Sequence, residues 1–117
     1  MAVSTFKYKG KRIYLADYSD QNEAELFNTL NEVAEFCEKL DKKVLWLCNF
    51  EGTTITTVFA NAVNTVSKEK IVPKVEKAAI IGISPIRKVL LNYFNSFTGG
   101  HFVGFSDEES AKEYLVE

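Results

Sequence analysis

The chain alternates between short continuous apolar runs and longer stretches in which apolar residues recur with a helical period. Short runs that are apolar throughout are typical of strands buried on both faces. The four runs are 13–16, 44–48, 78–83 and 101–105. A further segment, 5–8, is joined to the first run by the turn Lys9-Gly10-Lys11. It is predicted to add an antiparallel edge strand, because a tight turn reverses the chain.

Each of the four runs is followed by a predicted helix. The first three helices have the apolar stripes Leu26, Phe27, Leu30, Val33, Ala34, Cys37, Leu40; Val58, Ala62, Val63, Val66; and Ile86, Val89, Leu90, Tyr93, Phe94, Phe97. The second must end before Pro73, since proline has no backbone N–H to donate. Ser84-Pro85 is predicted to open the third as N-cap and first-turn proline, and Gly99-Gly100 to end it.

Two pairs of residues have the spacing of a capping box, in which an N-cap side chain and the side chain three residues later satisfy each other's backbone N–H groups. Asp20 with Glu23 is predicted to open the first helix. Ser106 with Glu109 is predicted to open a short last helix that ends at 114–115.

Four consecutive strand-then-helix units predict an α/β fold with a mainly parallel sheet, because a helical crossover returns each strand in the same direction. In such folds, ligands and partners usually meet the loops at the carboxyl ends of the strands. These loops are predicted at 17–20, 49–56, 84–88 and from 106 onward.

Size and charge narrow the classes of function. With 117 residues and an apolar content of 46%, the chain is expected to form one domain, 1–117, with a substantial core. A net charge of −2 provides no overall basic field, so nucleic acid is not an expected partner. No apolar run approaches the roughly 20 residues that cross a bilayer, so we expect no membrane insertion and a cytoplasmic location.

No group of residues predicts a metal or redox centre. Cys37 and Cys48 are not part of a C-x-x-C pair or a Cys/His cluster, and we expect both to be buried thiols in a reducing compartment. His101, the one histidine, has no nucleophile placed beside it by the sequence. We therefore expect no cofactor, no metal and no catalytic activity.

Carboxylates and cations in the predicted loops are the remaining polar signals. Asp17, Asp20 and Glu51 fall at one rim of the sheet, where an acid cluster is one interpretation and caps with solvated turns are the simpler one. Arg87 and Lys88 fall in the first turn of the third helix, where cations oppose the helix dipole. They suggest contact with an anion or an acidic partner, against the alternative of a solvated helix end.

The pattern resembles the STAS-like family, and within it a subgroup of small stand-alone bacterial proteins. The matching stretches, which cover most of the chain, are YKGKRIYLADYSD, KKVLWLCNFEG, VPKVEKAAIIGISPIRKVLLNYFNSFTG and FSDEESAKEYLVE. This resemblance implies the fold of the anti-sigma-factor antagonists, a right-handed superhelix of four β/α turns. It also implies a regulatory domain that binds a protein partner.

In antagonists that switch partners, a D-S-S-G-like motif with a phosphorylated serine begins the second helix. The motif falls on 56–59 here, where its aspartate, glycine and serines are missing and Thr57 is the hydroxyl near the phosphoacceptor position. Thr56 is predicted to be the N-cap of this helix, with Thr57 in the first turn as a possible phosphorylation site. The predicted partner-binding residues are Asn49, Glu51, Gly52, Thr53, Thr54, Thr56 and Thr57.

Three hypotheses for function follow. The first is a non-enzymatic interaction domain that presents the loop 49–57 and the second helix to a protein partner. The second is a carrier or sensor of an apolar or lipid-like ligand held between the third helix and the sheet, because this subgroup is also placed beside CRAL-TRIO lipid-transfer domains. The suitable walls are Ile86, Val89, Tyr93, Phe94 and Phe97. The third is an enzyme that uses the rim carboxylates, and a homodimer through exposed aromatic residues is a further alternative.

Overall fold

The computed structural model describes residues 2–117, apart from the side chain of Ile86. Within these residues the strands are β1 (Val3–Tyr8), β2 (Lys11–Asp17), β3 (Val44–Asn49), β4 (Val75–Ile81) and β5 (Phe102–Phe105). The α-helices are α1 (Glu23–Glu38), α2 (Thr57–Val66), α3 (Lys88–Thr98) and α4 (Glu108–Val116). Three shorter helical turns, η1 (Ser67–Ile71), η2 (Val72–Lys74) and η3 (Pro85–Arg87), complete the helical elements.

The five strands form one sheet whose spatial order is the order of the sequence, β1-β2-β3-β4-β5. β1 pairs with β2 in antiparallel fashion, and every later pair is parallel. Each crossover therefore advances the chain by one strand in the same direction, as a superhelix requires. The predicted α/β fold, with its mainly parallel sheet and antiparallel N-terminal edge, is confirmed.

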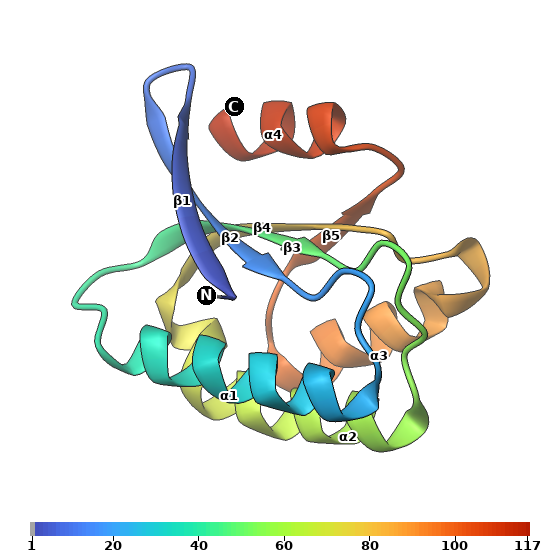
Figure 1. The fold of residues 1–117 in the computed structure, drawn as a ribbon. Helices are drawn as coiled ribbons and strands as arrows, with labels where there is room; N and C mark the ends of the chain where they lie inside the picture. The colour runs from blue at the N-terminus through green and yellow to red at the C-terminus, as the bar shows by residue number, and fades with distance from the viewer. Residues whose placement is uncertain (1) are drawn as a thin grey trace.

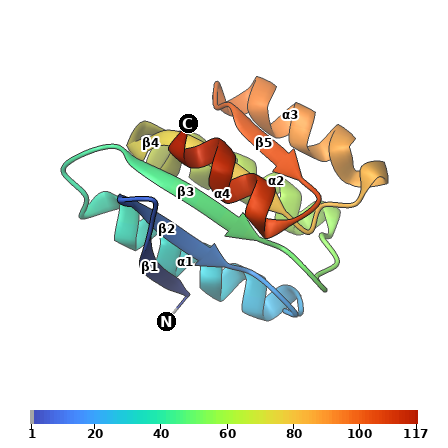
Figure 2. The ribbon, with the colours of Figure 1, turned by 90° about the horizontal axis from the view of Figure 1, so that it is seen from above.

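Helices cover both faces of the sheet, but unequally. α1, α2 and α3 lie against one face, and α4 lies alone against the other (Figures 1 and 2). Because side chains alternate along a strand, neighbouring residues of β3 enter different cores. Trp46 belongs to the core between the sheet and the helices α1, α2 and α3, whereas Leu45 and Leu47 pack with Ala111 and Leu115 of α4.

The first helix begins two residues later than the sequence predicts. Its N-cap is Asn22, whose side chain accepts a hydrogen bond from the Glu25 backbone N–H at 2.9 Å, while the Glu25 carboxylate accepts one from the Asn22 N–H at 2.9 Å. The predicted Asp20 and Glu23 box is wrong. Asp20 has a left-handed backbone, φ 51°, and its N–H donates to the Glu51 carbonyl at 2.9 Å.

The last helix is also capped by a different residue. Asp107 is its N-cap and accepts a hydrogen bond from the Ser110 backbone N–H at 2.7 Å, so the predicted Ser106 and Glu109 box is wrong. Aspartate is as good an N-cap as serine, and spacing alone does not choose between adjacent residues. The Glu109 carboxylate instead accepts a hydrogen bond from the Tyr8 hydroxyl of the β1-β2 hairpin.

The second helix follows the prediction at its start and ends before the proline. The Thr56 hydroxyl accepts a hydrogen bond from the Phe59 backbone N–H at 3.2 Å, which confirms Thr56 as the N-cap. Regular α-helix stops at Val66, and the chain continues through η1 into η2, where Pro73 lies in the first turn. That position suits proline because the first N–H groups of a helix have no intrahelical acceptor.

The third helix has a different buried face from the predicted one. Pro85 opens the 3-10 turn η3, α3 begins at Lys88, and the Ser84 side chain makes no capping bond to a described residue. Val89, Tyr93 and Phe97 are 71%, 58% and 39% exposed, whereas Leu91 is only 9% exposed. The predicted stripe is therefore wrong at Val89, Tyr93 and Phe97, whereas its Leu90 and Phe94 are partly buried, so the buried face is rotated toward Leu91.

The predicted end of that helix is confirmed. Gly99 is its C-cap in a left-handed conformation, φ 76°, and its N–H donates to the Asn95 carbonyl at 2.9 Å. Glycine is favoured there because a side chain disfavours positive φ.

Candidate ligand-binding cavity and the adjoining loop

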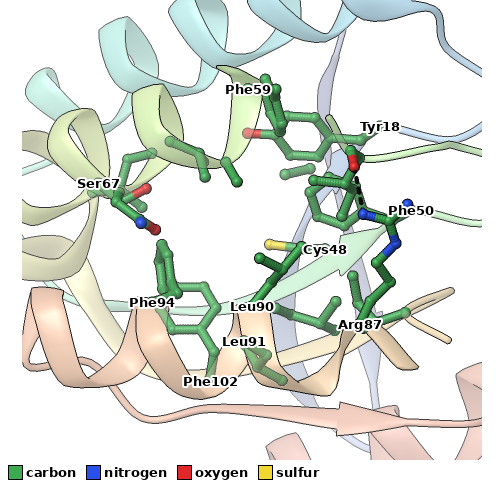
Figure 3. A pocket seen from close by; sticks show the side chains of 18 of the residues that line it. Tyr18, Cys48, Phe50, Phe59, Ser67, Arg87, Leu90, Leu91, Phe94 and Phe102 are labelled. Carbon is green, nitrogen blue, oxygen red and sulfur yellow. Dashed lines mark hydrogen bonds between the residues drawn. The ribbon is translucent and has the colours of Figure 1, made fainter. Parts of the chain in front are cut away.

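A cavity of about 80 Å³ lies between the sheet and the helices α2 and α3, and it is partly open to solvent. Its walls are almost entirely apolar, as Figure 3 shows. The lining residues with a polar or charged side-chain group are Tyr18, Trp46, Cys48, Asn64, Ser67 and Arg87. Concave sites with mostly apolar walls and a few polar groups are typical of small-molecule binding.

The alternation of the strands and the period of the helices produce these walls. Alternate residues of the sheet, including Cys48 and Ile80, face the cavity. Along the second helix and its continuation, residues three or four apart share one face, so Ala60, Asn64 and Ser67 line one side. Leu91, which the stripe prediction omitted, lines the side formed by α3.

Aromatic rings close one end of the cavity. Tyr18 and Phe50 stack with ring centroids 4.5 Å apart and an interplanar angle of 7°, and the Phe59 ring meets Tyr18 edge to face at 6.1 Å. Such pairs add stability beyond the area they bury. Burial raises the pKa of the Tyr18 hydroxyl well above its ordinary value, so this group is neutral.

The Cys48 sulfur points into the cavity from β3 (Figure 3). Burial raises the pKa of the Cys48 thiol to about 12, and Cys37 adds a smaller effect of the same sign. Neither cysteine forms a disulfide within the described part of the chain. At neutral pH the cavity therefore contains a thiol rather than a thiolate, which makes Cys48 a weak nucleophile.

Three buried residues give the cavity hydrogen-bonding capacity. Asn64 and Ser67 are 7% and 2% exposed, and both line it. Trp46 also lines it, and its buried Nε1–H has no hydrogen-bond partner among the described residues. A buried donor without an acceptor is costly, and a polar ligand atom is one way to satisfy it.

Arg87 and Lys88 were predicted together as anion contacts, and the structure places them differently. Arg87 is half-buried, lines the cavity, and its Nη1 donates to the Ile55 carbonyl at 2.9 Å. Lys88 is exposed and does not line the cavity. No carboxylate among residues 2–117 lies within ion-pair distance of Arg87 in the described contacts.

The predicted partner-binding loop adjoins this cavity, and two of its side chains, Asn49 and Thr53, form hydrogen bonds with other residues of the protein. The Asn49 side chain accepts a hydrogen bond from the Glu51 N–H at 2.9 Å. The Thr53 hydroxyl donates to the Tyr18 carbonyl at 2.6 Å and accepts from the Gln21 N–H at 3.1 Å. Asn49 therefore stabilises the turn within the loop, and Thr53 holds the loop against the neighbouring loop 17–21.

Other residues of the loop are turned outward. The Thr56 hydroxyl is an exception, because it forms two hydrogen bonds within the protein. It donates to the Glu23 carboxylate at 2.5 Å and accepts from the Phe59 N–H as the cap of α2. The exposed members of the predicted set are Glu51, Gly52, Thr54 and Thr57. These four positions form the surface that a partner of this loop can reach.

Of the rim carboxylates, Asp17 stabilises a local turn. Asp17 accepts hydrogen bonds from the Ser19 N–H at 3.0 Å and the Ser19 hydroxyl at 2.6 Å. Within residues 2–117, His, Cys, Asp and Glu form no group of three or more that could hold a metal ion. His101 is exposed and directly precedes β5.

Sequence reasoning found the region of the cavity but few of its walls. Of the predicted apolar walls, Phe94 lines it, whereas Val89, Tyr93 and Phe97 do not. The side chain of Ile86 lies outside the described residues. Phe50 and Ile55, from the threonine-rich loop, line the cavity and were not predicted to do so. Both could have been recognised in the sequence, because they are apolar residues in an otherwise polar loop.

None of the helices in the described part of the chain is both long enough and apolar enough to cross a membrane.

No protein-family model and no curated protein matches the chain. Among solved structures, it is similar to the crystal structure of an uncharacterized DUF3478-family protein from Shewanella loihica PV-4. The TM-score is 0.68 and the sequence identity 15%, over 97% of this chain and 92% of that chain. That protein has a SpoIIAA-like fold, the fold of the anti-sigma-factor antagonists, so the predicted architecture is confirmed.

Proposed function

We propose that this SpoIIAA-like chain acts as one non-enzymatic domain that binds a small apolar ligand in the cavity, as a carrier or sensor. The observation that supports this most directly is the cavity itself, which has apolar walls and a few buried polar groups. Its polar members are suited to orienting a ligand, because they line an otherwise apolar space. This choice places the carrier hypothesis above the partner hypothesis that the sequence favoured.

The empty space in the cavity favours an apolar occupant. The atoms that line the partly open cavity have no packing partners on one side and so lack dispersion contacts there. An apolar ligand recovers the lost dispersion contacts and removes its own surface from water. An occupant of this cavity therefore stabilises the fold as well as being bound by it.

Filling the cavity tests the proposal. Ala60 lines it from α2, so Ala60→Leu adds bulk inside, while Asn61→Leu places the same leucine side chain on the exposed face of the same helix. We expect Ala60→Leu to weaken binding of Nile red, a neutral apolar dye, by about tenfold or more, and Asn61→Leu to leave it unchanged. Circular dichroism establishes that both variants fold. Equal dye binding in the two variants would contradict a site in the cavity.

A second proposal concerns the loop 49–57 and the start of α2, which we infer to be a surface for a protein partner. It is supported by the exposure of Glu51, Thr54 and Thr57 and by Val58, an apolar residue that is 61% exposed beside them. Co-purification from the native host is expected to recover a partner that is lost on replacing Thr54 and Thr57 with glutamate. Ser96→Glu, on the exposed face of α3, is the control. A partner retained by the double variant would argue against this surface.

Phosphorylation of Thr57 is the regulatory form of this second proposal. Thr57 is exposed and is the first residue of α2, where a phosphate's negative charge is favoured by the helix dipole. Intact-mass analysis of protein from the native host is expected to show an increment of about 80 Da that Thr57→Val removes. The same increment in the variant would place the phosphate elsewhere.

A further inference from the structure

We propose that the ligand carries a carboxylate head and that Arg87 binds it at the rim of the cavity. This inference rests on the proposed function and names the class of ligand, an apolar monocarboxylic acid. It follows from a charge and a geometry that the fold builds around one side chain.

The positive charge of Arg87 has no ion-pair partner among the described residues. Arg87 is the one charged residue among the described residues that line the cavity, and those residues provide it with no ion-pair partner. Its guanidinium stays protonated at any physiological pH. A ligand that fills the cavity removes water from this half-buried cation, which costs free energy unless an anion compensates the charge. A carboxylate ligand supplies that anion, which a neutral apolar ligand cannot do.

The geometry holds the guanidinium in place. Its Nη1 donates to the Ile55 carbonyl at 2.9 Å, which is the hydrogen bond drawn in Figure 3. A guanidinium has five N–H donors in a planar fork, and this bond uses one. The remaining donors are suited to a carboxylate, which accepts two parallel hydrogen bonds from such a fork. The loop therefore fixes the group in advance, which lowers the entropy cost of binding.

The rest of the cavity suits the tail of such a ligand. Figure 3 shows Arg87 on one side of the cavity and Ser67 on the other, with Cys48 between them. A tail that extends from Arg87 passes the apolar side chains of Leu90 and Phe94. The ligand is therefore bound by its charged head at the rim and by its apolar body inside.

The adjacent lysine provides a matched control. Lys88 carries the same charge one residue away, but it is exposed and lies outside the cavity lining. A general attraction between the acid and a basic surface would involve both residues. Binding in the cavity requires Arg87 alone.

The experiment compares octanoate with 1-octanol, which share a tail and differ in the charged head. Isothermal titration at pH 7 measures both ligands with the wild type, Arg87→Gln and Lys88→Gln. We expect the wild type to bind octanoate about tenfold or more tighter than 1-octanol, since hydrogen bonds to charged groups are the strong ones. Arg87→Gln is expected to reduce this ratio to about one, and Lys88→Gln to preserve it. Arg87→Lys, which keeps the charge and loses the fork, is expected to give an intermediate ratio, and it replaces the glutamine variant if that variant does not fold.

The outcomes separate this inference from the proposed function. Equal binding of the acid and the alcohol by the wild type, or a preference for the acid that survives Arg87→Gln, would overturn the role of Arg87 while leaving an apolar site. Binding of neither ligand would overturn the apolar site and the inference with it.

Discussion

Single residues decide how closely the loops at the carboxyl end of the sheet approach one another. Gly82 follows β4 with φ 88°, and a Cβ atom there would lie 2.3 Å from the Glu51 backbone nitrogen. Cβ atoms in real proteins do not come that close to another atom. The neighbouring atoms here belong to the backbone of Phe50 and Glu51, so moving them would disturb the loop. Gly82 therefore lets the segment that includes Phe50, one end of the cavity, pack beside the end of β4.

Gly82→Ala is expected to lower the free energy of unfolding by about 2 kcal/mol or more, because steric overlap adds to backbone strain. Gly10→Ala is the matched control. Its φ is 82°, but a Cβ atom there would have no described atom within 4 Å, so only the strain of about 1 kcal/mol remains. Urea unfolding measures both variants. A loss for Gly10→Ala equal to that for Gly82→Ala would show that the overlap does not matter.

The cysteines predict how stability depends on pH. Burial raises the pKa of the Cys48 and Cys37 thiols from an ordinary value of 9.0 to about 12 in the folded protein. Between these two pH values the thiols lose their protons in the unfolded chain but keep them in the folded chain. The contribution of the thiols to the free energy of unfolding is therefore fully present below about pH 9 and is lost as the pH rises toward 12. Cys48→Ala is expected to make this fall less steep in urea unfolding at pH 8 to 11. An unchanged pH dependence would contradict the burial of this thiol.

At the scale of elements, α3 shows how a helix can be predicted correctly while its buried face is only partly right. Its existence and its end at Gly99 are readable from the apolar stripe and the glycine pair. Its orientation is not, because the 3-10 turn η3 precedes it and winds with fewer residues per turn than an α-helix. The buried face is therefore rotated toward Leu91, which leaves Leu90 and Phe94 on it and turns Val89 and Tyr93 to solvent.

This orientation predicts opposite results for two neighbouring residues. Leu91→Ala is expected to cost about 2 to 5 kcal/mol, because Leu91 is buried and lines the cavity. Val89→Ala is expected to change stability by no more than about 0.5 kcal/mol, because Val89 is 71% exposed. Thermal or urea unfolding of the two variants measures the difference. A larger loss for Val89→Ala would restore the orientation that the sequence stripe predicted.

At the scale of the whole molecule, the order of strands and helices was readable because each β/α unit is local in sequence. The continuous apolar run of β3 and the tight turn between β1 and β2 were enough to predict a parallel sheet with an antiparallel edge. The solved structure of SpoIIAA-like fold confirms that architecture at only 15% identity. The fold of the whole molecule therefore depends more on the order of apolar strands and amphipathic helices than on the identity of particular residues.

The cavity was not readable in the same way, because it depends on contacts between distant elements. Phe50, Ser67 and Arg87 come from three separate segments and meet only after the helices pack on the sheet. The sequence pointed to Arg87 as an anion contact, but it could not distinguish Arg87 from Lys88. That distinction depends on the path of η3 and on the hydrogen bond to Ile55.

The central claim, that the cavity holds an apolar ligand, is tested most directly by a two-dimensional ¹H–¹⁵N NMR titration with 1-octanol. This neutral probe makes the result independent of Arg87. The account predicts shifts concentrated on the backbone amides of residues that line the cavity, such as Cys48, Ala60 and Leu91. Shifts confined to the exposed face of α3 around Val89 and Tyr93, or no shifts at all, would contradict it.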